Sequence, residues 1–431
     1  MACKAHLELD QLPRSKPSLN PLYSIKLALD DRPWTSLTKE ERVNLIMEIE
    51  TWHDYQTLTV DEVEKMTNTN PLKAAQQLGQ SIWLDDIHRG MLNNGDFQGY
   101  IDRDGITGVT SNPAILKKAI LDHDDYDAAI AQLATENTGA KTAYEELVIA
   151  DLQQAADLLR PAYEASSGSD GFVSMEVSPH FAHDTEKTIS AGRRLWEMLD
   201  RPNVMIKVPS TVKGLAAIRA LTADGINVNA TLLFSVSRYR NVAKAYIAGI
   251  EDRLSRGLPV DNIASVASFF LSRIDVLVDK KLSAMGNQDE LLGKTAIACS
   301  RTAYQVWKAL FTGSEWLPLA NAGAQPQRLL WASTGTKDPS YSDVMYVEAL
   351  IGANTVNTLP IKTLDAYRDH GQPAARLQQD LDQANALLEN IEHLGINMET
   401  VAQQLEDEGL NKFIEPYDVL LETLQKKLAQ V

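Results

Sequence analysis

The feature that most constrains the fold is a series of eight short apolar segments, rich in β-branched and aromatic residues, that alternate with amphipathic helical patterns. The segments are 81–87, 105–110, 171–177, 204–209, 226–234, 263–270, 328–334 and 354–359. Strands that alternate with helices form parallel βαβ units, and eight units in roughly 280 residues match a (β/α)8 barrel. The competing architecture is a doubly wound open sheet, but no Gly-x-Gly-x-x-Gly turn follows any segment. We therefore predict an α/β fold of the (β/α)8 (TIM) barrel type.

The same pattern divides the chain into three predicted regions. Residues 1–70 form an N-terminal extension, an irregular arm with short helices, because capping boxes occur at 38–41 and 59–62. Residues 71–365 form the barrel, and residues 366–431 form C-terminal helices packed on it. The helical patterns of this last region are 374–391, 398–405 and 416–428.

Composition limits the partners and the compartment. The chain has 41 basic and 58 acidic residues and a formal charge of −17, so it repels nucleic-acid phosphates and anionic lipids at long range. The two cysteines, Cys3 and Cys299, provide neither a disulfide framework nor a cysteine zinc site. The chain has no apolar run of about 18 residues and no signal-peptide pattern. We predict a cytoplasmic protein without nucleic-acid or membrane partners, in which an anionic substrate would need local basic residues.

Lys207 is the sharpest candidate for chemistry. It lies in the segment 204–209, where apolar residues flank it on both sides. In a barrel of this type, functional side chains lie at the C-terminal ends of the strands. Burial disfavours the charged ammonium, and the neutral amine is the form that attacks a ketone. The alternative is a lysine that reaches past the strand end to a surface carboxylate.

Two carboxylates in the predicted barrel are further candidates. Asp85 ends the first strand and is a candidate general base or hydroxyl acceptor; the alternative is an aspartate that caps the next segment. Glu176 lies in the third strand, where apolar neighbours would raise its pKa and suit it to proton transfer. The alternative for Glu176 is an ion pair with Lys207 on the adjacent strand, which uses the same geometry without chemistry.

Polar residues in the fifth and sixth strands are candidate substrate contacts. The spacing of Asn227, Asn229 and Thr231 predicts one shared strand face, which suits binding of hydroxyl groups or an ordered water. Ser268 lies in the sixth strand. Arg273 begins the helix that follows, where an arginine near exposed backbone N–H groups suits a phosphate. The alternative for Arg273 is a surface pair with Asp275.

A histidine pair resembles a metal motif. His180 and His183 follow the third strand at metal-ligand spacing, which raises the possibility of a metal hydrolase. Metal sites in barrels draw ligands from several strand ends, and the other histidines mostly fall in helices or appendages. We interpret this pair as loop residues before a helix capped by Asp184, and we predict no metal and no other cofactor.

Five motifs together resemble the transaldolase family, over roughly residues 72 to 430, in a longer bacterial-type member of the class I Schiff-base aldolase superfamily. The motifs are GVTSNP at 108–113, VSMEV at 173–177, MIKVP at 205–209, GINVNATLLFS at 225–235 and SFFLSRI at 268–274. The resemblance implies a cofactor-free barrel enzyme of the non-oxidative pentose phosphate pathway. Such an enzyme moves a dihydroxyacetone unit from sedoheptulose 7-phosphate or fructose 6-phosphate to glyceraldehyde 3-phosphate or erythrose 4-phosphate.

The resemblance also implies a role for each matching residue. Lys207 would form the Schiff base, Asp85 would take the hydroxyl proton that starts carbon–carbon cleavage, and Glu176 would shuttle protons through a water held by Thr231. The hydroxyls of the three-carbon intermediate and the substrate phosphate would be held by Asn112, Asn229, Ser268 and Arg273.

One departure from the family pattern and two alternative functions remain to be considered. Shorter members have a second phosphate-binding arginine after strand seven; this chain reads WASTGTK at 331–337, so Lys337 is the expected substitute. Fructose-6-phosphate aldolases tend to carry Gln at the position of Glu176 and Tyr at that of Phe270, so both positions favour transaldolase over that alternative. A non-catalytic sugar-phosphate-binding barrel is the other alternative. We expect a monomer or homodimer, and the role of residues 1–70 is not determined by the sequence.

Overall fold

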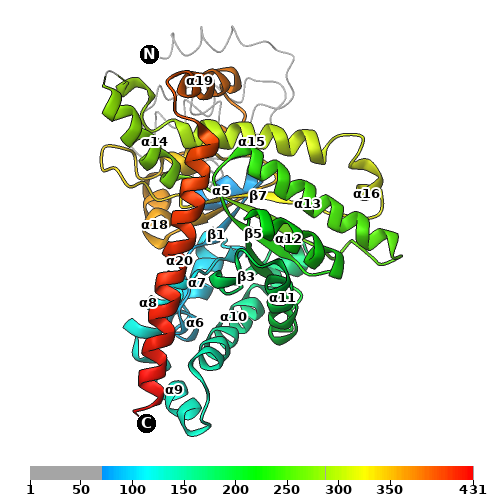
Figure 1. Cartoon of the computed structure of the whole chain (residues 1–431), viewed down its shortest axis with the longest axis vertical. Helices are drawn as coiled ribbons and strands as arrows, with labels where there is room; N and C mark the ends of the chain where they lie inside the picture. Colours follow the sequence, from blue (N-terminus) through cyan, green and yellow to red (C-terminus); the bar gives the residue numbers. More distant parts are fainter. Residues whose placement is uncertain (1–69, 287, 431) are drawn as a thin grey trace, which may run out of the picture. The chain divides into compact units, whose positions relative to one another are not determined.

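The computed structural model describes residues 70–286 and 288–430 (Figure 1). Pro71–Val431 form one compact unit, in which the C-terminal helices are grouped with the barrel. The irregular arm, the short helices and both capping boxes predicted within residues 1–70 lie outside the described residues.

The described residues contain a closed barrel of eight parallel strands arranged in chain order. Each strand lies within or overlaps one of the eight predicted segments, so the barrel prediction is confirmed and the doubly wound alternative is wrong. The strands are β1 (Gln80–Leu84), β2 (Gly108–Val109), β3 (Phe172–Glu176), β4 (Val204–Pro209), β5 (Val228–Leu233), β6 (Ser265–Phe270), β7 (Arg328–Ala332) and β8 (Thr355–Leu359).

Helices surround and extend the barrel (Figure 1). Those up to β6 are α5 (Pro71–Gln77), α6 (Arg89–Asn93), α7 (Asp96–Asp104), α8 (Pro113–Asp122), α9 (Asp127–Thr135), α10 (Ala140–Ala165), α11 (Thr185–Leu199), α12 (Val212–Asp224) and α13 (Val236–Ser255). Those after β6 are α14 (Ser272–Met285), α15 (Thr295–Phe311), α16 (Leu317–Asn321), α17 (Met345–Ala349), α18 (Ile361–His370), α19 (Leu381–His393) and α20 (Met398–Leu428). Single 3-10 turns are η2 (Asp124–Tyr126), η3 (Pro179–Phe181) and η4 (Asp289–Leu291).

Local sequence signals account for helix ends such as those of α12. The Thr211 hydroxyl accepts a hydrogen bond from the Gly214 N–H, which satisfies a free donor of the first turn. Gly225 ends the helix with φ +88°, a backbone conformation that glycine adopts without strain. Val212, the first residue of the helix, is exposed.

The C-terminal region differs from its predicted form. Residues 398–405 and 416–428 do not form two helices; they belong to the single 31-residue helix α20, which continues through Pro416. Proline removes one backbone hydrogen bond, but the buried side chains of Phe413 and Tyr417 pack on either side of it and hold the helix together. Helix α20 packs against α8, α10 and α14 and contacts β5.

The barrel interior changes character along its axis. At the N-terminal end of the strands, Arg328 donates to the Ser81 hydroxyl at 2.7 Å, and Trp83 donates its indole N–H to Asp170 at 2.8 Å. The Trp83 ring is fully buried and lies directly against Gly108 on the neighbouring strand. Ionisable side chains occur again at the C-terminal end of the strands. An apolar and aromatic layer that includes Trp83 therefore separates the two polar ends of the barrel.

Gly108 provides a test of this packing. A Cβ at residue 108 would approach Trp83 ring atoms to 2.4–2.6 Å, so Gly108→Ala should destabilise the barrel by about 1–3 kcal/mol through overpacking. Gly99→Ala is the matched control, because nothing lies within 4 Å of its added Cβ and alanine favours helix α7 by about 0.5–1 kcal/mol. Urea unfolding followed by circular dichroism checks both variants. Equal midpoints for the two would contradict the interpretation.

Candidate active site

A cavity of about 550 Å³ opens at the C-terminal end of the barrel. Lys207, Ser268 and Phe270 line it from the strands, and Asp85 and Thr110 line it from the residues that follow β1 and β2. Lys412 and Phe413, from the middle of α20, form another part of its wall. The volume is within the range of small-molecule sites. Figure 1 shows α20 as the long red helix that runs along this side of the chain.

Lys207 is buried and reaches the cavity. Its side chain is only 5% exposed, and its Nζ donates to the Ser111 carbonyl oxygen at 3.0 Å. The same nitrogen lies 3.9 Å from Glu176 Oε2 and 5.8 Å from the centre of the Phe413 ring. These contacts exclude the alternative in which the lysine reaches a surface carboxylate. The amine therefore lies where a ligand in the cavity can meet it.

Glu176 lies beside Lys207 because the two residues pair in register on β3 and β4. Both carboxyl oxygens are buried and accept no hydrogen bond from any described residue. Burial raises the pKa of Glu176 to about 7, although the nearby Lys207 opposes the rise. The predicted ion pair is present, but at 3.9 Å it is too long for a hydrogen bond. A carboxyl group with this pKa can accept or release a proton near neutral pH.

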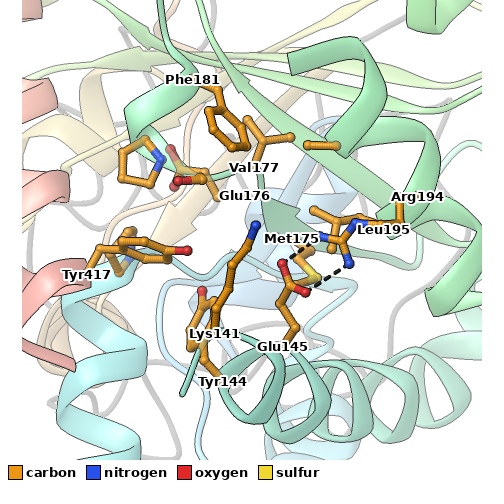
Figure 2. A pocket seen from close by; sticks show the side chains of 14 residues that line it. Lys141, Tyr144, Glu145, Met175, Glu176, Val177, Phe181, Arg194, Leu195 and Tyr417 are labelled. Carbon is orange, nitrogen blue, oxygen red and sulfur yellow. Dashed lines mark hydrogen bonds and ion pairs between the residues drawn. The ribbon is translucent and has the colours of Figure 1, made fainter. Parts of the chain in front are cut away.

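Behind Glu176 is a second, much smaller cavity, shown in Figure 2. It has a volume of about 10 Å³, which is near the lower limit for holding one water molecule. Tyr144 and Tyr417 line it, and their rings contact each other edge to face with centroids 5.4 Å apart. Glu145 and Arg194 form an ion pair of 2.6 Å at its side (Figure 2). Glu176 therefore lies between the lysine of the main cavity and this second cavity.

Asp85 lies directly after β1 and is partly exposed to the main cavity. Thr110 donates its hydroxyl to Asp85 Oδ1 at 2.7 Å, and the Thr358 hydroxyl lies 2.7 Å from the same Thr110 oxygen. Burial raises the pKa of Asp85, with the positive charge of Lys207 opposing the rise. The alternative capping role is wrong, because the N-cap of α6 is His88. Asp86 also lines the cavity, so both adjacent carboxylates are near the site.

Strands β3, β5 and β6 share a buried hydrogen-bond chain. Asn229 donates its amide to the Ser174 hydroxyl at 3.0 Å, and Ser268 donates its hydroxyl to Asn229 Oδ1 at 2.7 Å. Asn227 does not belong to this group. Its side chain instead bonds the backbone at Val204 and Ala264, because it precedes β5 at the opposite end of the barrel. The predicted shared face is therefore wrong for Asn227.

Thr231 lies at an irregularity of β5. The register with β6 shifts between Ala230 and Leu233, and Leu232 has φ +63°. Positive φ at a residue with a side chain is strained and is common at functional sites. The Thr231 hydroxyl is buried and has no hydrogen-bond partner among the described residues. This hydroxyl is thus available to a bound water or ligand.

Asn112 and Arg273 reach the cavity from helix N-termini. Asn112 is the N-cap of α8, where its side-chain oxygen accepts from the N–H groups of Ala114 and Ile115. Arg273 is the second residue of α14 and lies 5.4 Å from the centre of the Phe270 ring.

The Arg273 guanidinium suits an anion. Its buried Nη1 has no hydrogen-bond partner among the described residues, and burial lowers the pKa of the group. The alternative pair with Asp275 is wrong, because Asp275 accepts from the Ala296 N–H and the Tyr346 hydroxyl, both at 2.7 Å.

The lysines that line the cavity are not the one that the sequence predicted as a phosphate contact. Lys337 is exposed and is not part of the cavity lining, although its charge acts on Asp85. Lys118 of α8 and Lys412 of α20 do line the cavity. The sequence contains no local signal for either lysine, because their placement depends on how the two helices pack together.

The histidines after β3 do not form the metal motif considered above. His180 pairs with Asp418 at 2.7 Å and is exposed, and His183 is exposed. Asp184 caps α11 by accepting from the Lys187 N–H at 3.1 Å, as predicted.

Comparisons with known proteins agree with this geometry. The profile of the transaldolase/fructose-6-phosphate aldolase family matches residues 82–424. A transaldolase of Thiobacillus denitrificans is 46% identical over 354 residues, which cover 82% of this chain and 99% of the relative. Transaldolases of Thermobifida fusca (45% identical) and Trichodesmium erythraeum (44% identical) each align with 84% of this chain and 99% of their own length.

The chain belongs to the transaldolase family. Membership makes it an enzyme that acts on sugar phosphates, and the Schiff-base mechanism is general for the family. The cavity of this transaldolase provides the buried amine that such a mechanism requires. Among the described residues, no helix combines the length and apolar character needed to span a bilayer.

The electrostatics of this site can be tested through Glu176. Replacing Lys207 with Met removes the positive charge that lowers the pKa of Glu176, so that pKa should rise above about 7. Infrared spectra of the protonated carboxyl across pH report the titration, and Glu176→Gln identifies its band. An ordinary pKa near 4.5 in both proteins would show that the group is not desolvated.

Proposed function

We propose that this transaldolase transfers a dihydroxyacetone unit from sedoheptulose 7-phosphate or fructose 6-phosphate to glyceraldehyde 3-phosphate or erythrose 4-phosphate, through an imine on Lys207. The observation that carries the proposal is the Lys207 amine, buried at the cavity wall with the Glu176 carboxyl 3.9 Å away. A carboxyl whose pKa is about 7 can take the proton that the lysine must lose before it attacks.

Imine formation uses Lys207, Glu176 and Thr231. The neutral amine adds to C2 of the ketose, forming a C–N bond and a hydroxyl at C2. Protonation of that hydroxyl lets it leave as water, and Glu176 supplies this proton through a water molecule held by the Thr231 hydroxyl. Support for this assignment comes from the burial of both side chains and the lack of hydrogen-bond partners for their oxygens among the described residues.

Cleavage uses Asp85. Its carboxylate takes the proton from the C4 hydroxyl, the C3–C4 bond breaks, and the bonding electrons move into the iminium to form an enamine. The first aldehyde then leaves, and the acceptor aldehyde reacts by the reverse steps. The Thr110 hydrogen bond orients the Asp85 carboxylate toward the cavity. Asp86 lacks this hydrogen bond among the described contacts, which favours Asp85 as the base.

The enamine must stay bound until the acceptor arrives. Asn112, Asn229 and Ser268 hold its hydroxyl groups in the proposed mechanism. The amide of Asn229 and the hydroxyl of Ser268 are already oriented by their mutual hydrogen bond, and the α8 cap orients Asn112. Oriented polar groups lower the entropic cost of holding a small intermediate.

The substrate phosphate is placed against Arg273, with Lys337 as the second contact. A buried guanidinium nitrogen without a protein partner supports the first assignment, and the electrostatic effect of Lys337 on Asp85 supports the second. Lys118 and Lys412 compete for the second role because they line the cavity. The proposal also retains a monomer or homodimer in the cytoplasm as its working form.

Fructose-6-phosphate aldolase activity is the alternative, since the matched family profile includes both enzymes. Glu176 and Phe270 both favour transfer, and both lie at the site. Release of free dihydroxyacetone from fructose 6-phosphate at the same rate with and without erythrose 4-phosphate would favour the aldolase.

Borohydride trapping tests the proposed nucleophile. Incubation with fructose 6-phosphate and borohydride should add a three-carbon mass to Lys207, because reduction converts the imine into a stable amine. Lys207→Met should lose both the adduct and transfer activity, while Lys412→Met should keep the adduct. Transfer activity retained by Lys207→Met would refute the mechanism.

The phosphate assignment is tested by comparing fructose 6-phosphate with fructose. Arg273→Ala should lower kcat/KM for the phosphorylated donor by roughly 10- to 150-fold, the effect of a charged hydrogen bond, and change that for fructose little. Lys337→Ala should lower the same preference less, with Lys118→Ala and Lys412→Ala as comparisons. Equal losses for both donors in Arg273→Ala would contradict a phosphate contact.

A further inference from the structure

Two histidines that are separated in the sequence meet outside the active site. His88 precedes α6, and His123 follows α8; their rings stack with centroids 4.7 Å apart and planes 5° from parallel. The exposed Asp125 completes the group. One ligating atom from each of the three side chains lies within 4.8 Å of the other two. Among the described residues, this is the one group of three or more His, Cys, Asp or Glu side chains that lie so close together.

We propose that His88, His123 and Asp125 bind one late first-row divalent cation of the Zn²⁺ or Co²⁺ type. Two imidazoles and one carboxylate are the ligands that these ions favour. Tetrahedral coordination at about 2.0–2.1 Å would bring the ligating atoms to about 3.4 Å from one another. The stacked rings direct their lone pairs into parallel planes, so one ring must rotate before both can bind the same ion. His88 Nδ1 accepts the Met91 N–H at 3.2 Å, so His88 must give up this hydrogen bond in order to ligate. The exposure of Asp125 and the partial burial of both histidines leave room for these rotations.

The backbone around the cluster is held in place by other contacts. Arg89 forms a 2.8 Å ion pair with Asp151, which also accepts the Tyr126 hydroxyl at 2.8 Å. The Arg89 N–H donates to the same Tyr126 hydroxyl at 2.9 Å. Residues next to His88 and Asp125 are thus joined before any ion binds. A preorganised framework of this kind lowers the cost of assembling a metal site.

The local charge and the local space also favour a cation. The Asp86, Asp96 and Asp125 carboxylates act electrostatically on His88 and oppose the repulsion from His123, and the neighbouring Arg89 is engaged by Asp151. A Cβ at Gly90 would lie 2.7 Å from Asp125 Oδ2 and 3.1 Å from His88 Nδ1. Glycine at this position therefore lets the carboxylate approach the His88 ring.

The location suggests what a bound ion does. His88 belongs to the segment after β1 that also carries Asp85 and Asp86, and His123 ends the helix that Asn112 begins. A cation would join these two segments, which both form walls of the main cavity. Its role is structural, and the proposal does not depend on the catalytic assignments.

Cobalt titration of the metal-free full chain tests the site. Cys3→Ser, His6→Gln and His53→Gln are introduced in every protein of the series, because these three residues are potential metal ligands outside the described residues. One equivalent of Co²⁺ should produce a saturable visible ligand-field band, and Zn²⁺ should displace it. Zn²⁺ should also raise the Tm, because it binds the folded state.

Two variants test the histidine ligands, and a third variant is the control. His88→Asn and His123→Asn should each weaken Co²⁺ affinity by more than about tenfold, since even indirect changes around a metal cost 10- to 100-fold. Asparagine at residue 88 retains an N-cap acceptor for α6, which preserves folding. His370→Asn is the matched control, because His370 contacts two carboxylates but belongs to no metal-binding cluster among the described residues.

The Co²⁺ titrations of these variants decide whether the site exists. A band that His88→Asn and His123→Asn abolish, and that His370→Asn retains, supports the site. Absence of a saturable band, or a band that survives both substitutions, overturns it. Circular dichroism spectra of the variants establish that any loss of binding is not a loss of fold.

Discussion

The paired burial of Lys207 and Glu176 is the interaction on which the active site depends. An ammonium and a carboxylate both lose hydration when they enter a protein interior, and a 3.9 Å separation recovers only part of that loss. Strand register holds them there, since the two residues are partners on β3 and β4. The barrel thus maintains a carboxyl group with a pKa of about 7 next to the amine that must shed its proton.

Rigid support explains how the barrel keeps this arrangement. Residues of β3, β5 and β6 are joined by the chain of hydrogen bonds through Ser174, Asn229 and Ser268. The aromatic layer around Trp83 separates this polar end from the Arg328 and Asp170 contacts at the opposite end of the strands. A site on adjacent strands with a packed floor has little freedom to rearrange, so the reacting groups keep their distances.

Helix α20 gives the site its outer wall. Phe413 lies 5.8 Å from the Lys207 nitrogen, and Lys412 lines the same cavity, although both residues are about 200 positions further along the chain. The sequence patterns predicted two helices here, 398–405 and 416–428, with a break between them that ends at Pro416. The break does not occur, because buried contacts on both sides of the proline outweigh one missing hydrogen bond.

The sequence alone determined the eight strands, their order and the placement of Lys207, Glu176, Asn229 and Ser268 within strands. These follow from side-chain alternation, helix caps and turns, which are properties of neighbouring residues. Only the tertiary structure decided that Asn227 faces away from the site, that Lys412 and Tyr144 approach it, and that His88 meets His123. Such contacts depend on how distant helices pack, and packing is set by the whole buried surface at once, which leaves no local pattern to read.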